Sequence, residues 1–353
     1  MTSTARADVP DPRRYFAHVP AGRGPYADDP VCLYLETTNR CNLLCATCPR
    51  TFETLEPPAD MSWELFVRIV DQFPTIARVV LHGVGEPMLV RSLPRMIRYL
   101  KDRGTYVLFN TNGTLLTTGK GRELIHSGLD ELRISLDAAE PEAFSRVRGR
   151  ALFPRIMRNI RAFRALQQEL AVATPRLSLW LTGLKETIGQ LKQFVLLAHD
   201  CGIAEVYLQR LVYLPEGLGL ARAEQALFAS DDAAEEHRLI AEAEDVARRL
   251  GIAFNASGAT DPGSSLKPEQ QDRPWSPCRR PWTLMYFTAH GRALPCCIAP
   301  FSMRGYDNFT LGDATQQTLR EIWNGEQYRS FRGALLSDDP PSTCAGCGLR
   351  WSL

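Results

Sequence analysis

The pattern of apolar positions divides the first 210 residues into alternating strand-like and helix-like segments. Short apolar or β-branched runs, typical of buried strands, occupy residues 31–37, 77–82, 105–110, 131–136, 177–182 and 204–211. Helical periodicity lies between these runs, for example at 62–72, 92–103, 154–170 and 186–199. Six such units predict a parallel α/β sheet with right-handed crossovers, whose chemistry lies at the carboxyl ends of the strands.

The rest of the chain is less regular. Residues 1–30 are polar and predict an irregular leader that wraps the body or stays mobile. Within 212–275 we expect a loop at 214–219, a helix at 231–250 and a connector at 255–274. Within 276–353 we expect a hairpin around His290 and helices at 319–323 and 327–336. The predicted parts are therefore 1–30, 31–211, 212–275 and 276–353.

Seven of the ten cysteines form two sets with the spacing of metal ligands. Cys41, Cys45 and Cys48 follow the first predicted strand with three and then two intervening residues. Three thiolates would leave one iron of an iron–sulfur cluster open to an outside ligand. The second set, near the end of the chain, has the four thiolates that a complete cluster needs and consists of Cys278, Cys296, Cys344 and Cys347. A zinc knuckle completed by a distant ligand and a structural zinc ribbon are the alternatives.

Charge and composition exclude several kinds of partner. The 41 basic and 40 acidic residues give a formal charge of +1, which argues against a broad nucleic-acid surface. No apolar run reaches the roughly 20 residues that a membrane span needs, and the N-terminus lacks the apolar core of a signal peptide. We therefore expect a soluble, cytoplasmic protein that binds neither nucleic acid nor membrane.

Together, the cysteine triad and the stretch His82-Gly-Val-Gly-Glu-Pro87 at the end of the second strand give the sequence its family resemblance. The sequence resembles the radical S-adenosylmethionine (SAM) enzymes over residues 31–211 and 276–350. The resemblance implies a partial (β/α)6 barrel in which the triad holds a [4Fe–4S] cluster and SAM binds its fourth iron. Cleavage of SAM would then give a 5′-deoxyadenosyl radical. One departure is Thr47, where the family often has an aromatic residue, so adenine contacts must come from elsewhere.

The resemblance also implies which residues bind SAM. The glycine-rich segment would hold the SAM amino group through its backbone and a carboxylate, from Gly83, Gly85, Glu86 and Pro87. Polar residues on and after the fourth strand would contact the ribose or the carboxylate, namely Ser135, Asp137 and Arg148. A helix N-cap is the alternative for Asp137. Asn112 would contact SAM or substrate, or simply form a turn.

The C-terminal cysteine region resembles the shortened auxiliary-cluster domain called twitch, which is related to the SPASM domain. It implies one auxiliary [4Fe–4S] cluster on the second cysteine set, and two clusters in all. The sequence leaves three roles for Cys297: a cluster ligand in place of Cys296, a free thiol that donates a hydrogen atom to the substrate, or a packed side chain. Cys32 and Cys201 are predicted to be core thiols.

The leading functional hypothesis is oxidation of a secondary alcohol to a ketone on an aminocyclitol or sugar-like intermediate of antibiotic biosynthesis. It rests on similarity to enzymes of the 2-deoxy-scyllo-inosamine dehydrogenase type, since 30 leader residues are too few for the peptide-binding module of many peptide-modifying relatives. Candidate general bases are His82, Lys185, Glu186 and Arg210. The expected partner is an electron donor such as flavodoxin or ferredoxin. The alternatives are an epimerase that uses Cys297, a peptide maturase with a separate recognition protein, and a zinc-binding structural protein.

Overall fold

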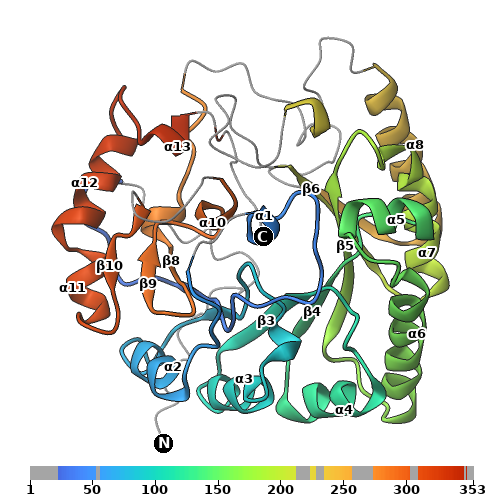
Figure 1. Cartoon of the computed structure of the whole chain (residues 1–353), viewed down its shortest axis with the longest axis horizontal. Helices are drawn as coiled ribbons and strands as arrows, with labels where there is room; N and C mark the ends of the chain where they lie inside the picture. Colours follow the sequence, from blue (N-terminus) through green and yellow to red (C-terminus); the bar gives the residue numbers. More distant parts are fainter. Residues whose placement is uncertain are drawn as a thin grey trace, which may run out of the picture.

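A computed structural model describes residues 23–52, 56–211, 223–227, 234–256, 273–302, 309–345 and 347 (Figure 1). The predicted loop at 214–219 and most of the leader and connector lie outside these ranges. No helix within them is long and apolar enough to cross a membrane.

The core of the fold is one ten-stranded sheet in the order β10-β9-β8-β1-β2-β3-β4-β5-β6-β7. The strands are β1 (Cys32–Leu35), β2 (Arg78–Val80), β3 (Tyr106–Thr111), β4 (Glu131–Ser135), β5 (Arg176–Gly183), β6 (Glu205–Arg210), β7 (Ala253–Ala256), β8 (Leu284–Phe287), β9 (Arg292–Leu294) and β10 (Gly312–Asp313). Strands β1 to β7 pair in parallel with their neighbours, so the six predicted β–α strands are confirmed. Strand β7 is a seventh that the sequence pattern did not predict; it overlaps the start of the predicted connector.

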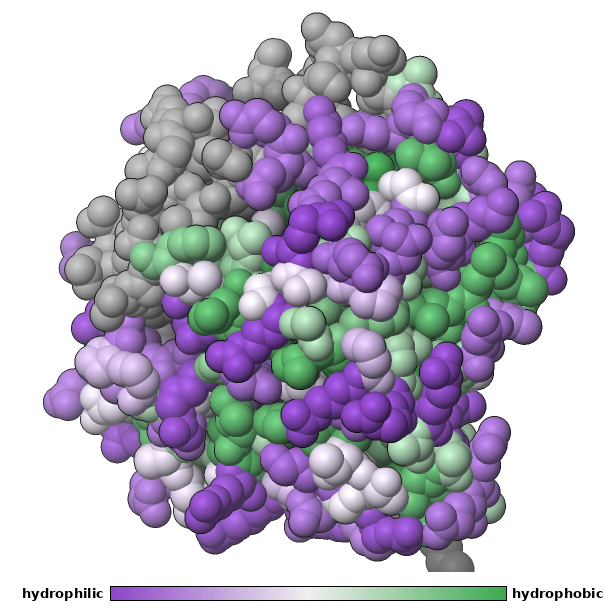
Figure 2. Space-filling view, turned by 45° about the vertical axis from the view of Figure 1, so that its right-hand side comes forward, coloured by the Kyte–Doolittle hydropathy of each residue, from purple (hydrophilic) through white to green (hydrophobic). Residues whose placement is uncertain are grey.

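Helices cover the outer side of the curved sheet (Figure 1). They are α2 (Trp63–Val70), α3 (Leu93–Lys101), α4 (Thr118–Ser127), α5 (Pro141–Arg148), α6 (Phe153–Glu169), α7 (Leu191–Asp200) and α8 (Ala234–Leu250). Each buries an apolar stripe; α2, for example, buries Phe66, Ile69 and Val70. On the face shown in Figure 2, hydrophilic and hydrophobic residues are interspersed. The helices predicted between the strands are present, with bounds shifted by a few residues.

The C-terminal region continues the same sheet. Strand β8 pairs in parallel with β1, and β8 and β9 form the predicted antiparallel hairpin. The short helices α10 (Ala299–Ser302), α11 (Leu319–Trp323), α12 (Glu326–Leu335) and α13 (Ser342–Ala345) follow it. The described end of the leader packs on this region, because the indole N–H groups of Trp282 and Trp323 donate to the carbonyls of Gly24 and Asp28, at 2.7 and 2.6 Å. The leader thus wraps the C-terminal region over residues 23–29.

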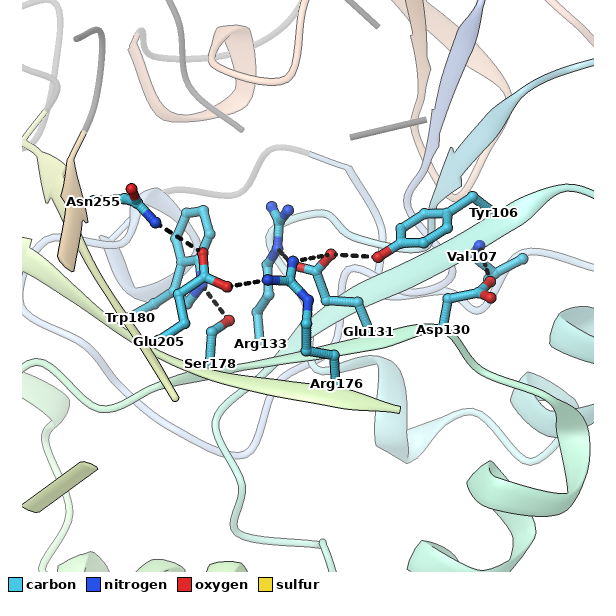
Figure 3. A network of polar contacts seen from close by, with 10 residues as sticks. All are labelled: Tyr106, Val107, Asp130, Glu131, Arg133, Arg176, Ser178, Trp180, Glu205 and Asn255. Atoms are coloured by element: carbon cyan, nitrogen blue, oxygen red, sulfur yellow. Dashed lines mark hydrogen bonds and ion pairs between the residues drawn. The ribbon is translucent and has the colours of Figure 1, made fainter. Parts of the chain in front are cut away.

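An ionic network centred on the buried Glu131 lies at the amino ends of neighbouring strands (Figure 3). The Glu131 carboxylate accepts from Arg133 Nε at 2.6 Å and from the Tyr106 hydroxyl at 2.9 Å, and it pairs with Arg176 Nη2 at 3.2 Å. Arg176 also pairs with Glu205. Burial raises the pKa of Glu131, but Arg133 and the other arginines outweigh it and lower the pKa to about 2. Glu131 is therefore held ionised in the core.

Candidate active site

A cavity opens at the carboxyl ends of the parallel strands, where the predicted parallel sheet placed the chemistry. Its wall contains most of the predicted site residues: Cys41, Cys45, Cys48, His82, Gly83, Gly85, Glu86, Asn112, Ser135, Asp137, Arg148 and Cys297. Residues far apart in the sequence therefore meet in one place. Pro87 is buried beside the cavity at the start of a short 3-10 helix, Pro87–Leu89.

The cysteine loop is fastened to the end of α5. The backbone N–H of Ala46 donates to the Val147 carbonyl at 2.8 Å, and the N–H of Leu44 donates to the Arg148 carbonyl at 3.4 Å. Gly149 ends α5 with a positive φ of 73°, and a Cβ atom there would overlap the Leu44 carbonyl. The close approach of helix and loop thus requires glycine at this position.

Arg148 connects the cysteine loop with the predicted SAM-contacting carboxylate. Its Nη2 pairs with Asp137 Oδ2 at 2.7 Å, and its Nη1 lies 3.7 Å from Cys45 Sγ. The other Asp137 oxygen accepts from the Thr182 backbone N–H at 2.7 Å. The N-cap alternative for Asp137 is wrong, since α5 begins at Pro141 and its N-cap is Glu140. Asp137 instead joins the ends of β4 and β5 to the cysteine loop.

Glu86 fixes the glycine-rich segment to the neighbouring strand. Its buried carboxylate accepts from the Met88 N–H at 3.0 Å, the Thr111 hydroxyl at 2.8 Å and the Asn112 N–H at 2.7 Å. The Asn112 side chain lies 3.9 Å from Cys41 Sγ, measured from its amide nitrogen. Both Glu86 oxygens are thus engaged within the protein, and the carboxylate orders the loops around the cavity.

The four C-terminal cysteines lie close to one another, and one of them, Cys296, directly precedes Cys297 of the cavity wall. Burial is the main cause that raises the pKa of the Cys344 thiol, followed by the closeness of Cys278, Cys296 and Cys347. These four come from the turn before β8, the turn after β9, and helix α13 with its following turn. Such a set of thiolates fits a fully ligated [4Fe–4S] cluster.

Among the described residues, no group of three or more His, Cys, Asp or Glu side chains is arranged to hold a single metal ion. The cavity wall adds glycines and polar groups beside the first cysteine set, which suits a nucleoside-bearing ligand there.

The candidate bases lie in different environments. His82 lines the cavity and stacks on Phe301 with 6.3 Å between ring centres; burial, with a contribution from Arg133, lowers its pKa to about 4. Lys185 and Glu186 are exposed and do not line the cavity, and Glu186 pairs with Arg146 at 2.6 Å. The Arg210 side chain lies outside the described part of the chain.

Sequence reasoning missed several wall residues: Asn110, Thr182, Gln209, Leu211 and Phe301. Asn110, Thr182, Gln209 and Leu211 lie at or just after the carboxyl ends of β3, β5 and β6. Their position at strand ends was the available signal, but no motif distinguished them from other strand residues.

Comparisons with known proteins agree with this geometry. The Radical SAM superfamily profile matches residues 35–198, and the profile of the SPASM iron–sulfur cluster-binding domain matches residues 278–348. The chain is 25% identical over 334 residues to a tungsten-containing aldehyde ferredoxin oxidoreductase cofactor-modifying protein of Pyrococcus furiosus, covering 90% of this chain and 87% of the relative. It is 26% identical to a PqqA peptide cyclase of Streptomyces rochei, covering 91% and 83%.

Solved structures show the same fold. The SuiB structure of Streptococcus suis bound to S-adenosylmethionine superposes with a TM-score of 0.66 at 18% identity, over 86% of this chain and 68% of that chain. The anSMEcpe structure with bound AdoMet gives a TM-score of 0.63 at 15% identity, over 87% and 84%. The chain therefore belongs to the radical SAM superfamily and carries a C-terminal SPASM domain, with SAM and two [4Fe–4S] clusters as its cofactors.

Proposed function

We propose that this enzyme oxidises a hydroxyl-bearing carbon of a small polar substrate to a carbonyl. When bound, SAM and its cluster supply a radical that removes one hydrogen atom, and the auxiliary cluster supplies an acceptor for one electron. Cys41, Cys45 and Cys48 would hold the first cluster, and the C-terminal cysteine set the second. The protein itself must then accept the hydroxyl proton, which balances the loss of two hydrogens.

His82 carries this proposal. It lies in the wall of the cavity that the first cysteine set also lines, and its lowered pKa keeps the imidazole neutral at pH 7, as a proton acceptor must be. Its Nδ1 atom has no hydrogen-bond partner among the described residues. The two other bases whose side chains the structure describes are exposed outside the cavity wall, so His82 is the preferred base.

The wall also supports a polar substrate. Beyond the predicted SAM contacts it offers neutral hydrogen-bonding groups from Asn110, Thr182 and Gln209. Asp137 and Arg148, which are charged, already pair with each other. Such a wall suits the hydroxyl and amino groups of an aminocyclitol or sugar-like intermediate of antibiotic biosynthesis. The reducing partner would be a flavodoxin or ferredoxin.

Cys297 supports a second candidate, a radical epimerase. Its buried thiol lines the same cavity. A thiol there could return a hydrogen atom to the substrate radical from the opposite face, and the thiyl radical would regain its hydrogen from one electron and one proton. A peptide maturase is the third candidate, because the relatives include a PqqA peptide cyclase and SuiB was solved with its precursor peptide SuiA.

The test uses the enzyme with both clusters, SAM and a reductant in deuterated water, against aminocyclitols, their glycosides and candidate precursor peptides. A product two mass units lighter supports oxidation. A product about one unit heavier, carrying solvent deuterium, overturns it in favour of an epimerase, and modification of peptides alone favours a maturase. His82→Asn should lower the oxidation rate about 10²-fold or more while both clusters remain bound. An unchanged rate would exclude His82 as the base.

A further inference from the structure

Glu36 is a fully buried carboxylate directly after β1 that no motif singled out. Its Oε2 accepts from the backbone N–H of Val84 and from the hydroxyl of Tyr286, each at 2.9 Å. Its Oε1 accepts from the backbone N–H of Ala289 at 3.2 Å. A carboxylate with three donors and no exposure is held in one orientation.

The three donors come from two parts of the protein. Val84 lies between the two glycines of the predicted SAM-binding segment, whereas Tyr286 and Ala289 belong to β8 and the turn after it, within the SPASM region. Glu36 itself extends β1, whose backbone pairs with β8. One side chain therefore joins the SAM-binding segment to the auxiliary domain.

The glycine before Val84 makes this junction possible. A Cβ atom at Gly83 would overlap the Cβ, Cγ and Oε2 atoms of Glu36. The space that a side chain at position 83 would fill is thus occupied by the carboxylate. The absence of a side chain at Gly83 is explained by Glu36, independently of any close approach of SAM.

We propose that Glu36 is a positioning residue that holds Gly83–Gly85 in the conformation SAM requires and makes SAM affinity depend on the contact with the SPASM domain. The inference goes beyond the proposed function, because it concerns SAM binding and not the substrate. Its test therefore needs no substrate, and it can fail while the proposed oxidation stands, or the reverse.

Replacement of Glu36 by glutamine is a sharp probe, because an amide cannot accept all three hydrogen bonds. If the amide NH2 group of the new glutamine points toward Ala289, two donors meet there, the NH2 group and the Ala289 backbone N–H. If the NH2 group points toward Val84, it meets the Val84 backbone N–H in the same way. Either way one buried N–H loses its acceptor. Phenylalanine at Tyr286 removes one donor and leaves the backbone contacts in place.

Glu56 provides a matched control. It is also buried and reaches the same hairpin, where its Oε1 lies 3.3 Å from the Thr288 hydroxyl and 3.3 Å from Arg292 Nε. In the described structure it makes no contact with the Gly83–Gly85 segment, and it acts on Glu36 through its charge, which contributes last among the causes that shift the pKa of Glu36. Glu56→Gln should therefore remove a buried charge beside Thr288 and Arg292 while leaving the three donors to Glu36 in place.

The experiment titrates SAM into the full chain with both clusters reduced and follows the electron paramagnetic resonance spectrum of the SAM-binding cluster. We expect Glu36→Gln to weaken SAM affinity at least tenfold, Tyr286→Phe to weaken it severalfold, and Glu56→Gln to stay within twofold, with iron content unchanged. Wild-type affinity in Glu36→Gln, or an equal loss in Glu56→Gln, overturns the proposal. If Glu36→Gln does not fold, unchanged affinity in Tyr286→Phe overturns it.

Discussion

Cys297 lines the active-site cavity, whereas its chain neighbour Cys296 lies with the three other auxiliary cysteines. The two residues follow β9 in a turn. We therefore predict that Cys296 ligates the auxiliary cluster and that Cys297 is a thiol in the cavity wall.

Single alanine substitutions test the different roles predicted for Cys296 and Cys297. Cys296→Ala should lower the iron content of the reconstituted enzyme from about eight to about four atoms per chain, because one [4Fe–4S] cluster loses a ligand. Cys297→Ala should keep about eight. Iron analysis and Mössbauer spectroscopy measure both, and loss of a cluster in Cys297→Ala would reverse the assignment.

Gly85→Ala should disrupt the SAM-binding segment. A Cβ atom at Gly85 would overlap the backbone carbonyls of Thr38 and Arg40, which cannot move without displacing the start of the cysteine loop. We expect at least a tenfold loss of SAM affinity, measured by equilibrium dialysis. Gly119→Ala is the control, since nothing lies within 4 Å of a Cβ there and alanine favours helix α4 by about 0.5–1 kcal/mol. An equal SAM affinity of Gly85→Ala and Gly119→Ala would contradict this prediction.

Glu131→Gln should destabilise the fold strongly. The substitution leaves the buried Arg133 without its ionic partner and weakens the contact to Arg176, and breaking a buried ion pair typically costs about 3–5 kcal/mol. Chemical denaturation measures the change in the free energy of unfolding. Glu235→Gln, which breaks an exposed pair with Arg238, should give no measurable change. A small effect at Glu131 would show that the network is not needed for stability.

The half-buried His82 predicts an acid-sensitive fold. Its pKa is about 4 in the folded protein, below the ordinary value of 6.5, so the unfolded chain binds more protons between these values and stability falls as the pH drops through this range. From pH 7 to pH 5 this group should remove about 2 kcal/mol of stability. Denaturant titrations of wild type and His82→Asn at both pH values measure the difference, and identical pH dependence in both would contradict the prediction.

The sequence by itself determined the parallel sheet, most of its helices and the two cysteine sets. Strand and helix periodicity are local properties, and the thiolates are recognised by spacing within one loop or by a family resemblance. Helices α4 and α5 were not predicted individually. The sequence of α4 is polar and contains two glycines, so it shows no clear apolar periodicity. Its buried residues are Gly121, Leu124 and Ser127.

Only the tertiary structure decided which polar residues meet. Glu36 contacts Val84 and Tyr286 across 48 and 250 residues, and Glu131 joins arginines from different strands. Lys185 and Glu186 also follow a strand, yet they point to solvent. Strand-end position brings a residue near the active rim, but packing in three dimensions decides which side chains enter the cavity and which buried charges find partners.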